Sequence, residues 1–523
     1  MIKLEIDNRK AILFCFLLGF VVRLIPEAVS YPYPIGFDTI GYAASISTGK
    51  IWYHSGTFFE YPWTNFFSTW LLYLFLIPVH NATKIDPFLL LKFASPILYA
   101  ANVCVVYLFS RKWLSWSIPK SLLASLFFTF QLASLRISWD LYRNSLAMIF
   151  LHLALPLIYK ANTLRGILSF TLLSLLVVFS HELVAVMLLG IVFGIVARDL
   201  ILHKCITLDW KVLFALIPSL TIFILMTLTT LSQYGFGAEP NIISAHNPPP
   251  YHPFNLFFIQ DYFKVASPME NYPTYFNLVL DVFGLFSILY LLWLPLIALG
   301  FFRDKILDVF SLILLAFSFN CIITPFFAVF QWSRWMYMLA YPFSFYAANG
   351  AFRHSYPNLQ RIKSKKGSIK SLSRLTLAIL SATILLSLLF MVMPTNLAFF
   401  SAGRINSYLP STMQHSTIPL QDQDDLINAI KWLNLNHHEN SCVLIHHALL
   451  PWTRLYPSET ITRIYYVLNI KDALDLALKE KFNYIYLIWW NTEIGWYKIA
   501  IPDHFEEVYR SGRISIFQHK LNL

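Results

Sequence analysis

Few ionisable residues interrupt the long apolar segments of this sequence, and Asp38 stands in the most distinctive setting among them. It lies in Ile35–Tyr42 (IGFDTIGY), between two glycines and shortly after the first long apolar segment. A carboxylate at the end of such a segment can accept a proton from a substrate hydroxyl, or it can hold a cation. It can also serve as the N-cap of a helix over Thr39–Ile46. The sequence allows both roles together.

A second polar group consists of Asp140, Arg143 and Asn144, in the segment WDLYRN. Residues spaced i, i+3 and i+4 share one face of a helix, so we expect these three side chains to lie together. Such a group can form part of a binding site. The alternative is a local ion pair between Asp140 and Arg143 that anchors the start of a helix.

Two further segments carry candidate ligands. His181 and Glu182 offer an imidazole and a carboxylate, which suit a divalent cation, and His181 can also hydrogen-bond a phosphate or a sugar. The alternative is a polar turn between two helices. Arg334 stands between tryptophans in Gln331–Trp335 (QWSRW) and can clamp a phosphate through two parallel hydrogen bonds. The alternative is an aromatic-belt anchor with a snorkelling arginine. Arg23 is a weaker candidate for the same phosphate.

The composition places these residues in an integral membrane protein. Of 523 residues, 57% are hydrophobic and 13% are charged, whereas soluble domains carry about 25% charged residues. The net charge of +11 does not indicate nucleic-acid binding, because basic residues in short loops meet anionic lipid headgroups. The basic residues cluster in every second gap between apolar segments: Lys3/Arg9/Lys10, Arg111/Lys112/Lys120, Lys160/Arg165, Arg198/Lys204/Lys211, Arg303/Lys305 and 353–374.

The positive-inside rule makes these basic gaps cytoplasmic, together with the N-terminus. The candidate residues named above then face outward. Phe66–Val79 is apolar but shorter than the about 20 residues that a span needs. A crossing there would invert every later gap, so we interpret it as a re-entrant or interfacial helix on the outer side. About eleven spanning helices are predicted: 10–28, 88–110, 120–137, 143–159, 166–181, 183–197, 211–231, 279–301, 306–328, 335–351 and 375–394.

The pattern predicts two domains. Residues 1–399 form the multi-pass membrane domain, with a first outer loop over 29–87 and a Pro-rich outer loop over 232–277. That second loop is either a lid or a connector. Residues 400–523 are polar enough for a soluble extracytoplasmic α/β domain. Its predicted elements are helices 424–434 and 471–481, strands 441–446 and 482–490, and a hairpin over 506–518 with its turn at Ser511-Gly512.

The order of these parts resembles the glycosyltransferase C superfamily. Its members include protein O-mannosyltransferases, aminoarabinose transferases and oligosaccharyltransferase catalytic subunits. In that superfamily the first outer loop carries an Asp that acts as catalytic base or metal ligand, and Asp38 matches its position. Thr39 follows Asp38, where O-mannosyltransferases have Glu. The resemblance implies that Asp140 is the second acidic residue and that Arg334, with Arg143, binds a lipid phosphate.

The resemblance implies an inverting glycosyltransferase on the extracytoplasmic face of the cell membrane. The donor would be a polyprenyl- or dolichyl-phosphate sugar, and the acceptor a protein, a lipid or a glycan. Asp140, His181 and Glu182 would hold the sugar or a divalent cation such as Mg²⁺ or Mn²⁺. One alternative is a transporter or lipid-linked-glycan flippase, which predicts ionisable residues in mid-membrane on facing helices. Another is a non-catalytic membrane scaffold.

Two other motifs have a structural interpretation. The Asp422–Asp425 run resembles a nucleotide-sugar DxD motif, but it precedes a predicted helix and is interpreted as a cap. Trp489–Gly495 resembles the WWDxG signature of oligosaccharyltransferases. Asn491 replaces the Asp, so this segment is interpreted as the end of a strand.

Overall fold

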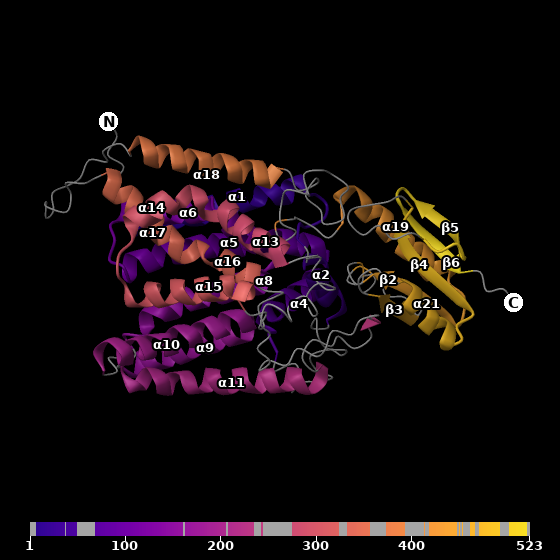
Figure 1. Cartoon of the computed structure of the whole chain (residues 1–523), viewed down its shortest axis with the longest axis horizontal. Coiled ribbons are helices and arrows are strands. Elements are labelled where there is room, and N and C mark those ends of the chain that lie inside the picture. The colour runs from indigo at the N-terminus through magenta and orange to yellow at the C-terminus, as the bar shows by residue number, and fades with distance from the viewer. Residues whose placement is uncertain are drawn as a thin grey trace.

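The computed structural model shows a bundle of long helices with a small α/β domain at one end (Figure 1). It is the architecture that the sequence predicts. The structure describes residues 7–36, 38–49, 68–160, 163–204, 208–234, 242–243, 275–323, 332–355, 373–392, 413, 418–446, 449, 452, 461–465, 470–491 and 501–519.

Long apolar helices form most of the bundle. In the described residues, seven helices are long and apolar enough to cross a membrane, or eight if one bent pair is a single span. These spans include α1 (Asn8–Val29), α5 (Pro87–Lys112), α10 (Glu182–His203), α11 (Trp210–Tyr234), α15 (Lys305–Ile323) and α18 (Arg374–Val392). Helix α9 (Leu164–Ser180) is a shorter apolar helix. The predicted total of about eleven stays a prediction.

Three predicted spans are not single continuous α-helices in the structure. The prediction of one helix over 120–137 is wrong, because α6 (Ile118–Thr129) and α7 (Leu132–Asp140) meet at a bend of 61°. Gln131 has an extended backbone there, and its side chain accepts a hydrogen bond from the amide of Ala133. The predicted span over 279–301 consists of α13 (Tyr275–Tyr290), a 3₁₀ turn (Leu291–Trp293) and α14 (Leu294–Gly300). The predicted span over 335–351 consists of α16 (Trp332–Met338) and α17 (Ala340–Ser355).

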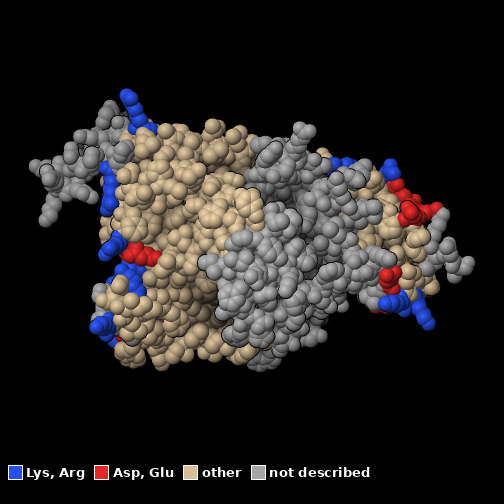
Figure 2. All heavy atoms as spheres, in the orientation of Figure 1, with Lys and Arg blue, Asp and Glu red and all other residues tan. Residues whose placement is uncertain are grey.

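The two ends of the bundle differ in charge. Lys and Arg gather at the end that holds the N-terminus, opposite the C-terminal domain (Figures 1 and 2). We call these the basic end and the domain end. The positive-inside rule predicts that the basic end is cytoplasmic. Arg9 lies near the start of α1, Arg111 and Lys112 end α5, and Lys211 lies near the start of α11.

Short elements cover the domain end of the bundle. Helix α2 (Thr39–Thr48) follows the first long helix, and α4 (Leu71–Thr83) packs against α2 and against α8 (Tyr142–Ala154). With 13 residues, α4 is shorter than the about 20 residues of a span. This helix begins five residues later than the segment 66–79 that we interpreted as re-entrant.

The C-terminal domain is a six-stranded sheet in the order β1-β3-β2-β4-β6-β5, with α19 (Gln423–Asn436) and α21 (Ile470–Lys479). Strands β1, β3, β2 and β4 are parallel, whereas β6 is antiparallel to β4 and β5. The predicted helices, strands and terminal hairpin are confirmed within a few residues. The strands are β1 (Ile242–Ile243), β2 (Ser441–His446), β3 (Ile461–Tyr465), β4 (Tyr484–Trp490), β5 (Phe505–Ser511) and β6 (Ile514–His519).

Strand β1 comes from the segment 232–277, which we interpreted as a lid or a connector. Ile242 pairs with Ile464, and Ile243 pairs with Tyr465 at the edge of the sheet. This short strand ties the second outer loop to the C-terminal domain. Most of the remaining loop lies outside the described residues.

Candidate functional site

Asp38 occupies the N-cap position of α2, but its side chain makes no capping hydrogen bond. Its Oδ2 instead lies 3.4 Å from Nη2 of Arg334, at the start of α16. The hydroxyl of Thr39 donates to the carbonyl of Gly36 at 2.8 Å and closes the turn. The side chains of Asp38 and Arg334 are 32% and 28% exposed. The structure therefore brings together two predicted site residues at a position that solvent can reach.

Gly36 allows the turn before Asp38 to lie directly against the end of α7. Its φ is +122°, and a Cβ built on it would be 2.5 Å from the carbonyl oxygen of Trp139 and 2.7 Å from Cβ of Asp140. A side chain at this position would meet both the unfavourable backbone conformation and the end of α7. Glycine thus allows the turn that precedes Asp38 to press against Trp139 and Asp140.

The interpretation of Asp140 and Arg143 as neighbours on one helix face is wrong. Leu141 ends α7 and starts α8 with ψ of 52°, so Asp140 and Arg143 lie on two different helices. Asp140 pairs instead with Arg136, four residues earlier on α7, and both side chains are buried. The break at Leu141 is the physical reason, because it interrupts the spacing that places i and i+3 side by side.

Arg143 lies in the first turn of α8, with its side chain buried. Its Nη1 donates a hydrogen bond to the hydroxyl of Thr69, just before α4. Asn144 is buried beside it, and neither polar atom of its side chain has a hydrogen-bond partner among the described residues. The predicted phosphate ligand Arg143 is thus present at the domain end, as a buried cation behind Asp38.

The charges around Asp38 oppose one another. Desolvation raises the pKa of Asp38, Arg334 lowers it, and Asp140 raises it, with smaller lowering effects of Arg143 and Arg136. The net direction is upward, which makes the carboxylate a stronger base than an ordinary aspartate. Since a third of the side chain is exposed, water moderates this shift.

His181 lies between α9 and α10, as the alternative of a polar turn between two helices predicts, and it has a capping role that the sequence analysis did not predict. It is the N-cap of α10, and its Nδ1 accepts a hydrogen bond from the amide of Leu183 at 3.0 Å. Burial lowers the pKa of His181 to about 3, so the imidazole is neutral. The acceptor role of Nδ1 then assigns the ring proton to Nε2, which lies 3.8 Å from Oε1 of the half-exposed Glu182. His181 is therefore a hydrogen-bond donor at this position.

These side chains do not form a ready cation site. In the described part of the chain, no three His, Cys, Asp or Glu residues converge as metal ligands would. The carboxylate of Asp140 is taken up by Arg136, and that of Asp38 by Arg334. A protonated Nε2 of His181 has no lone pair for a metal. The divalent cation stays a prediction, and the steps below do not depend on it.

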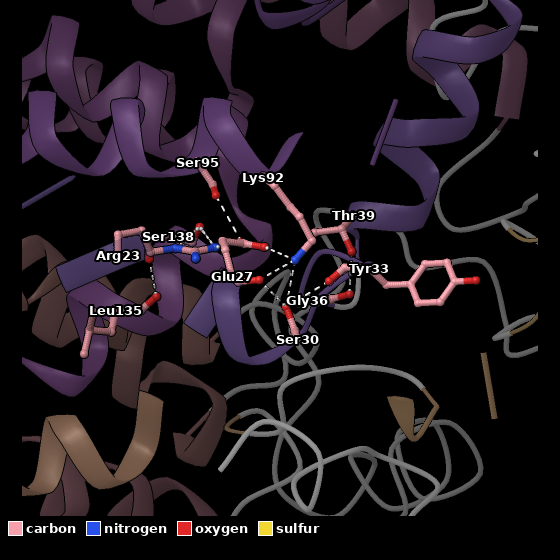
Figure 3. A network of polar contacts seen from close by, with 10 residues as sticks. All are labelled: Arg23, Glu27, Ser30, Tyr33, Gly36, Thr39, Lys92, Ser95, Leu135 and Ser138. Atoms are coloured by element: carbon pink, nitrogen blue, oxygen red, sulfur yellow. Dashed lines mark hydrogen bonds and ion pairs between the residues drawn. The ribbon is translucent and has the colours of Figure 1, made fainter. Parts of the chain in front are cut away.

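A buried ionic network underlies the turn (Figure 3). Nη2 of Arg23 lies 2.7 Å from Oε1 of Glu27, and Nζ of Lys92 lies 3.2 Å from Oε2 of the same carboxylate. Ser95 donates to Glu27 at 3.2 Å, and Arg23 also donates to the carbonyl of Ser138. The prediction of Arg23 as a phosphate ligand is not supported, because its side chain is 0% exposed and already paired.

The sequence analysis missed Arg136, Glu27 and Lys92. Two of the ion pairs have i, i+4 spacing, which is a signal that could have found them: Arg23 with Glu27, and Arg136 with Asp140. The predicted helix 120–137 ended before Asp140, which hid the second pair. No local signal connects Lys92 to Glu27, since 65 residues separate them.

The acidic run at the start of α19 connects this helix to the sheet of the C-terminal domain. Asp422 makes no capping hydrogen bond with its side chain, so the interpretation of the run as a cap is wrong for this residue. The buried carboxylate accepts from Nε1 of Trp490 at 2.9 Å and pairs with Arg513 at 2.7 Å. Trp489 and Trp490 end strand β4, as predicted. Residues 492–495 of that motif lie outside the described residues.

No family model matches the sequence, and no curated protein matches it. Among solved structures, the chain is similar to the crystal structure of ArnT from Cupriavidus metallidurans in the apo state. The TM-score is 0.46 with 10% sequence identity, and the match covers 97% of this chain and 97% of that chain.

Proposed function

We propose that this protein is a membrane glycosyltransferase that moves a sugar from a polyprenyl-phosphate-linked donor to a hydroxyl-bearing acceptor. The observation that carries the proposal is the Asp38–Arg334 pair at the domain end. It combines a carboxylate of raised pKa with a guanidinium, and both side chains are partly exposed. The first can serve as a general base, and the second can bind a phosphate.

In the proposed reaction, Asp38 accepts the proton of the acceptor hydroxyl. The acceptor oxygen forms a bond to the anomeric carbon, and the bond from that carbon to the phosphate oxygen breaks. Arg334, assisted by the charge of Arg143, stabilises the departing lipid phosphate. A single displacement inverts the anomeric carbon. Asp140, His181 and Glu182 would orient the sugar, His181 through its Nε2–H.

The pair must open for this chemistry. In an in-line displacement the attacking oxygen and the leaving phosphate lie on opposite sides of the anomeric carbon, so their two protein partners cannot remain in contact. When the donor phosphate draws Arg334 away, Asp38 loses the guanidinium that lowers its pKa. The carboxylate then becomes more basic at the moment when a hydroxyl needs to be deprotonated.

One observation favours the transporter alternative. Three ionisable residues are buried on facing helices, as in an ion pathway: Arg23, Glu27 and Lys92. Their charged groups contact one another, however, and Lys92 is also bonded to the Glu27 carbonyl at 2.6 Å and to Ser30 at 3.1 Å. We interpret this network as a support for the Asp38 turn.

The test is sugar transfer by the purified protein in proteoliposomes, with a panel of polyprenyl-phosphate sugars and candidate acceptors. We expect the wild type to release polyprenyl phosphate from one donor class, and Asp38→Asn to release none while it keeps the wild-type unfolding temperature. Full activity of Asp38→Asn would remove Asp38 as the base. Flipping of lipid-linked sugar without transfer would replace the proposal with the transporter.

A further inference from the structure

Among the described residues, Tyr33 links the segment that precedes Asp38 to the C-terminal domain. This residue lies between α1 and α2, five positions before Asp38. Its hydroxyl donates a hydrogen bond to Oδ1 of Asp424 in the first turn of α19, 391 residues away in sequence. Its ring meets Trp452 of the C-terminal domain edge-on, with the ring centroids 6.0 Å apart.

The ring of Tyr33 also contacts the membrane domain. It packs edge-on against Phe88 of α5, with centroids 5.3 Å apart, and Phe88 in turn lies 6.1 Å from Trp452. These three rings sit where the two domains share one apolar core, which continues from Ile40 of α2 to Leu426 of α19. Tyr33 adds a directional polar contact to this apolar interface.

The backbone of Tyr33 is fixed from the other side. Its carbonyl accepts a hydrogen bond of 2.8 Å from the hydroxyl of Ser30, whose oxygen lies 3.1 Å from Nζ of Lys92. Figure 3 shows the ring pointing away from this network. Tyr33 therefore connects the buried ionic network, through its backbone, to the C-terminal domain, through its side chain.

Gly36, which lies between Tyr33 and Asp38, is held in place by two contacts. Gly36 is pressed against Trp139, and its carbonyl accepts the hydrogen bond from Thr39 that closes the turn. Because Tyr33 lies three positions before Gly36, we expect a shift of Tyr33 to disturb the contact between Gly36 and Trp139 and to displace Asp38 with it. A misplacement of about 1 Å in a catalytic group can cost about 100-fold in rate.

We propose that Tyr33 is a positioning residue through which the C-terminal domain sets the place of the Asp38 carboxylate. A domain that binds an acceptor can in this way couple acceptor docking to the placement of the base. The coupling of Tyr33 to Asp38 rests on contacts alone. Only its kinetic consequence rests on the proposed function.

The first experiment measures amide hydrogen exchange in the full-length protein. Tyr33→Phe removes the hydroxyl that reaches Asp424 and keeps the ring between Phe88 and Trp452. The matched control is Tyr509→Phe on β5, where the ring stacks on Trp432 within the C-terminal domain. Loss of a hydrogen bond to a charged group corresponds to about tenfold faster exchange in the segment that it holds. We expect this faster exchange in peptides that cover residues 38–46 of Tyr33→Phe, and we expect the same peptides of Tyr509→Phe to exchange at the wild-type rate. Unchanged exchange of these peptides in Tyr33→Phe would overturn the proposal.

The second experiment is a double-mutant cycle on transfer kinetics with Tyr33→Phe and Asp424→Ala. Each variant should lower kcat about tenfold with an unchanged KM for the donor, since the base is misplaced and the donor site is not. The double variant should lose no more than either single variant, because both remove one contact. Additive losses, or a change confined to KM, would overturn the proposal. If the wild type transfers no sugar, the proposed function fails and the exchange result alone decides the role of Tyr33.

Discussion

Nη2 of Arg334 lies 3.4 Å from Oδ2 of Asp38, although 296 residues separate the two in sequence. A distance of 3.4 Å is long for a hydrogen bond between charged groups. Both side chains are about a third exposed. Partly exposed pairs of this kind contribute little to stability. The pair can therefore open at small cost when a phosphate competes for Arg334 or a hydroxyl approaches Asp38.

Arg334 can be tested as the phosphate ligand by two substitutions. Arg334→Lys keeps the charge but loses the planar pair of donors, so we expect kcat/KM to fall about tenfold. Arg334→Gln removes the charge, and the fall should reach about 100- to 1,000-fold. The measurement is the rate of transfer against donor concentration in proteoliposomes. Arg510→Gln, on the exposed strand β5, is the control and should leave the rate unchanged. A wild-type kcat/KM in Arg334→Gln would exclude Arg334 from phosphate binding.

The pH dependence of kcat/KM tests Asp38 as the base, because two substitutions should shift the profile in opposite directions. A base works when it is deprotonated, so activity rises with pH through the pKa of Asp38. Arg334, Arg143 and Arg136 lower this pKa and Asp140 raises it. Arg334→Gln should therefore move the acidic limb of the profile to higher pH, and Asp140→Asn should move it to lower pH. Shifts in the same direction for both variants would show that another group controls the limb.

Helix positions could be predicted from the sequence because the bilayer requires long apolar segments, which are local features. The breaks could not, since hydrophobicity continues through Phe130 and through Leu291–Trp293. What ends a helix there is backbone geometry, such as the extended conformation of Gln131. Strand β1 was missed for a similar reason, because its two residues become a strand only through pairing with β3.

The candidate site could be predicted as a set of residues but not as a set of pairs. Asp38 and Arg334 each stood out by their local setting, while their contact depends on a fold that brings the start of α2 to the start of α16. Asp140 was assigned the wrong partner because Leu141 breaks the helix between it and Arg143. The contact between Asp38 and Arg334 joins residues 296 positions apart, so no local spacing indicates it.

Gly36 and Gly49 form a matched pair that separates backbone strain from steric contact. Both have positive φ, but a Cβ at Gly49 meets nothing within 4 Å, whereas one at Gly36 is 2.5 Å from the Trp139 carbonyl. Gly49→Ala should cost about 1–2 kcal/mol through its left-handed conformation and leave transfer nearly unchanged. Gly36→Ala should also displace the turn and lower kcat about 100-fold. Transfer assays and thermal unfolding of both variants make the comparison. Equal kcat in the two would show that contact with α7 does not position Asp38.

Glu27 balances two buried cations, and its removal should destabilise the bundle strongly. Glu27 is 2% exposed, and both Arg23 and Lys92 pair with its carboxylate. Glu27→Gln keeps the shape but leaves two positive charges without a counter-charge, which typically costs about 3–5 kcal/mol. We expect a clearly lower thermal unfolding midpoint in detergent. The control is Glu507→Gln, which breaks the exposed pair with Arg510 and should leave the midpoint unchanged. A midpoint for Glu27→Gln that equals the control would show that the Glu27 carboxylate does not balance the charges of Arg23 and Lys92.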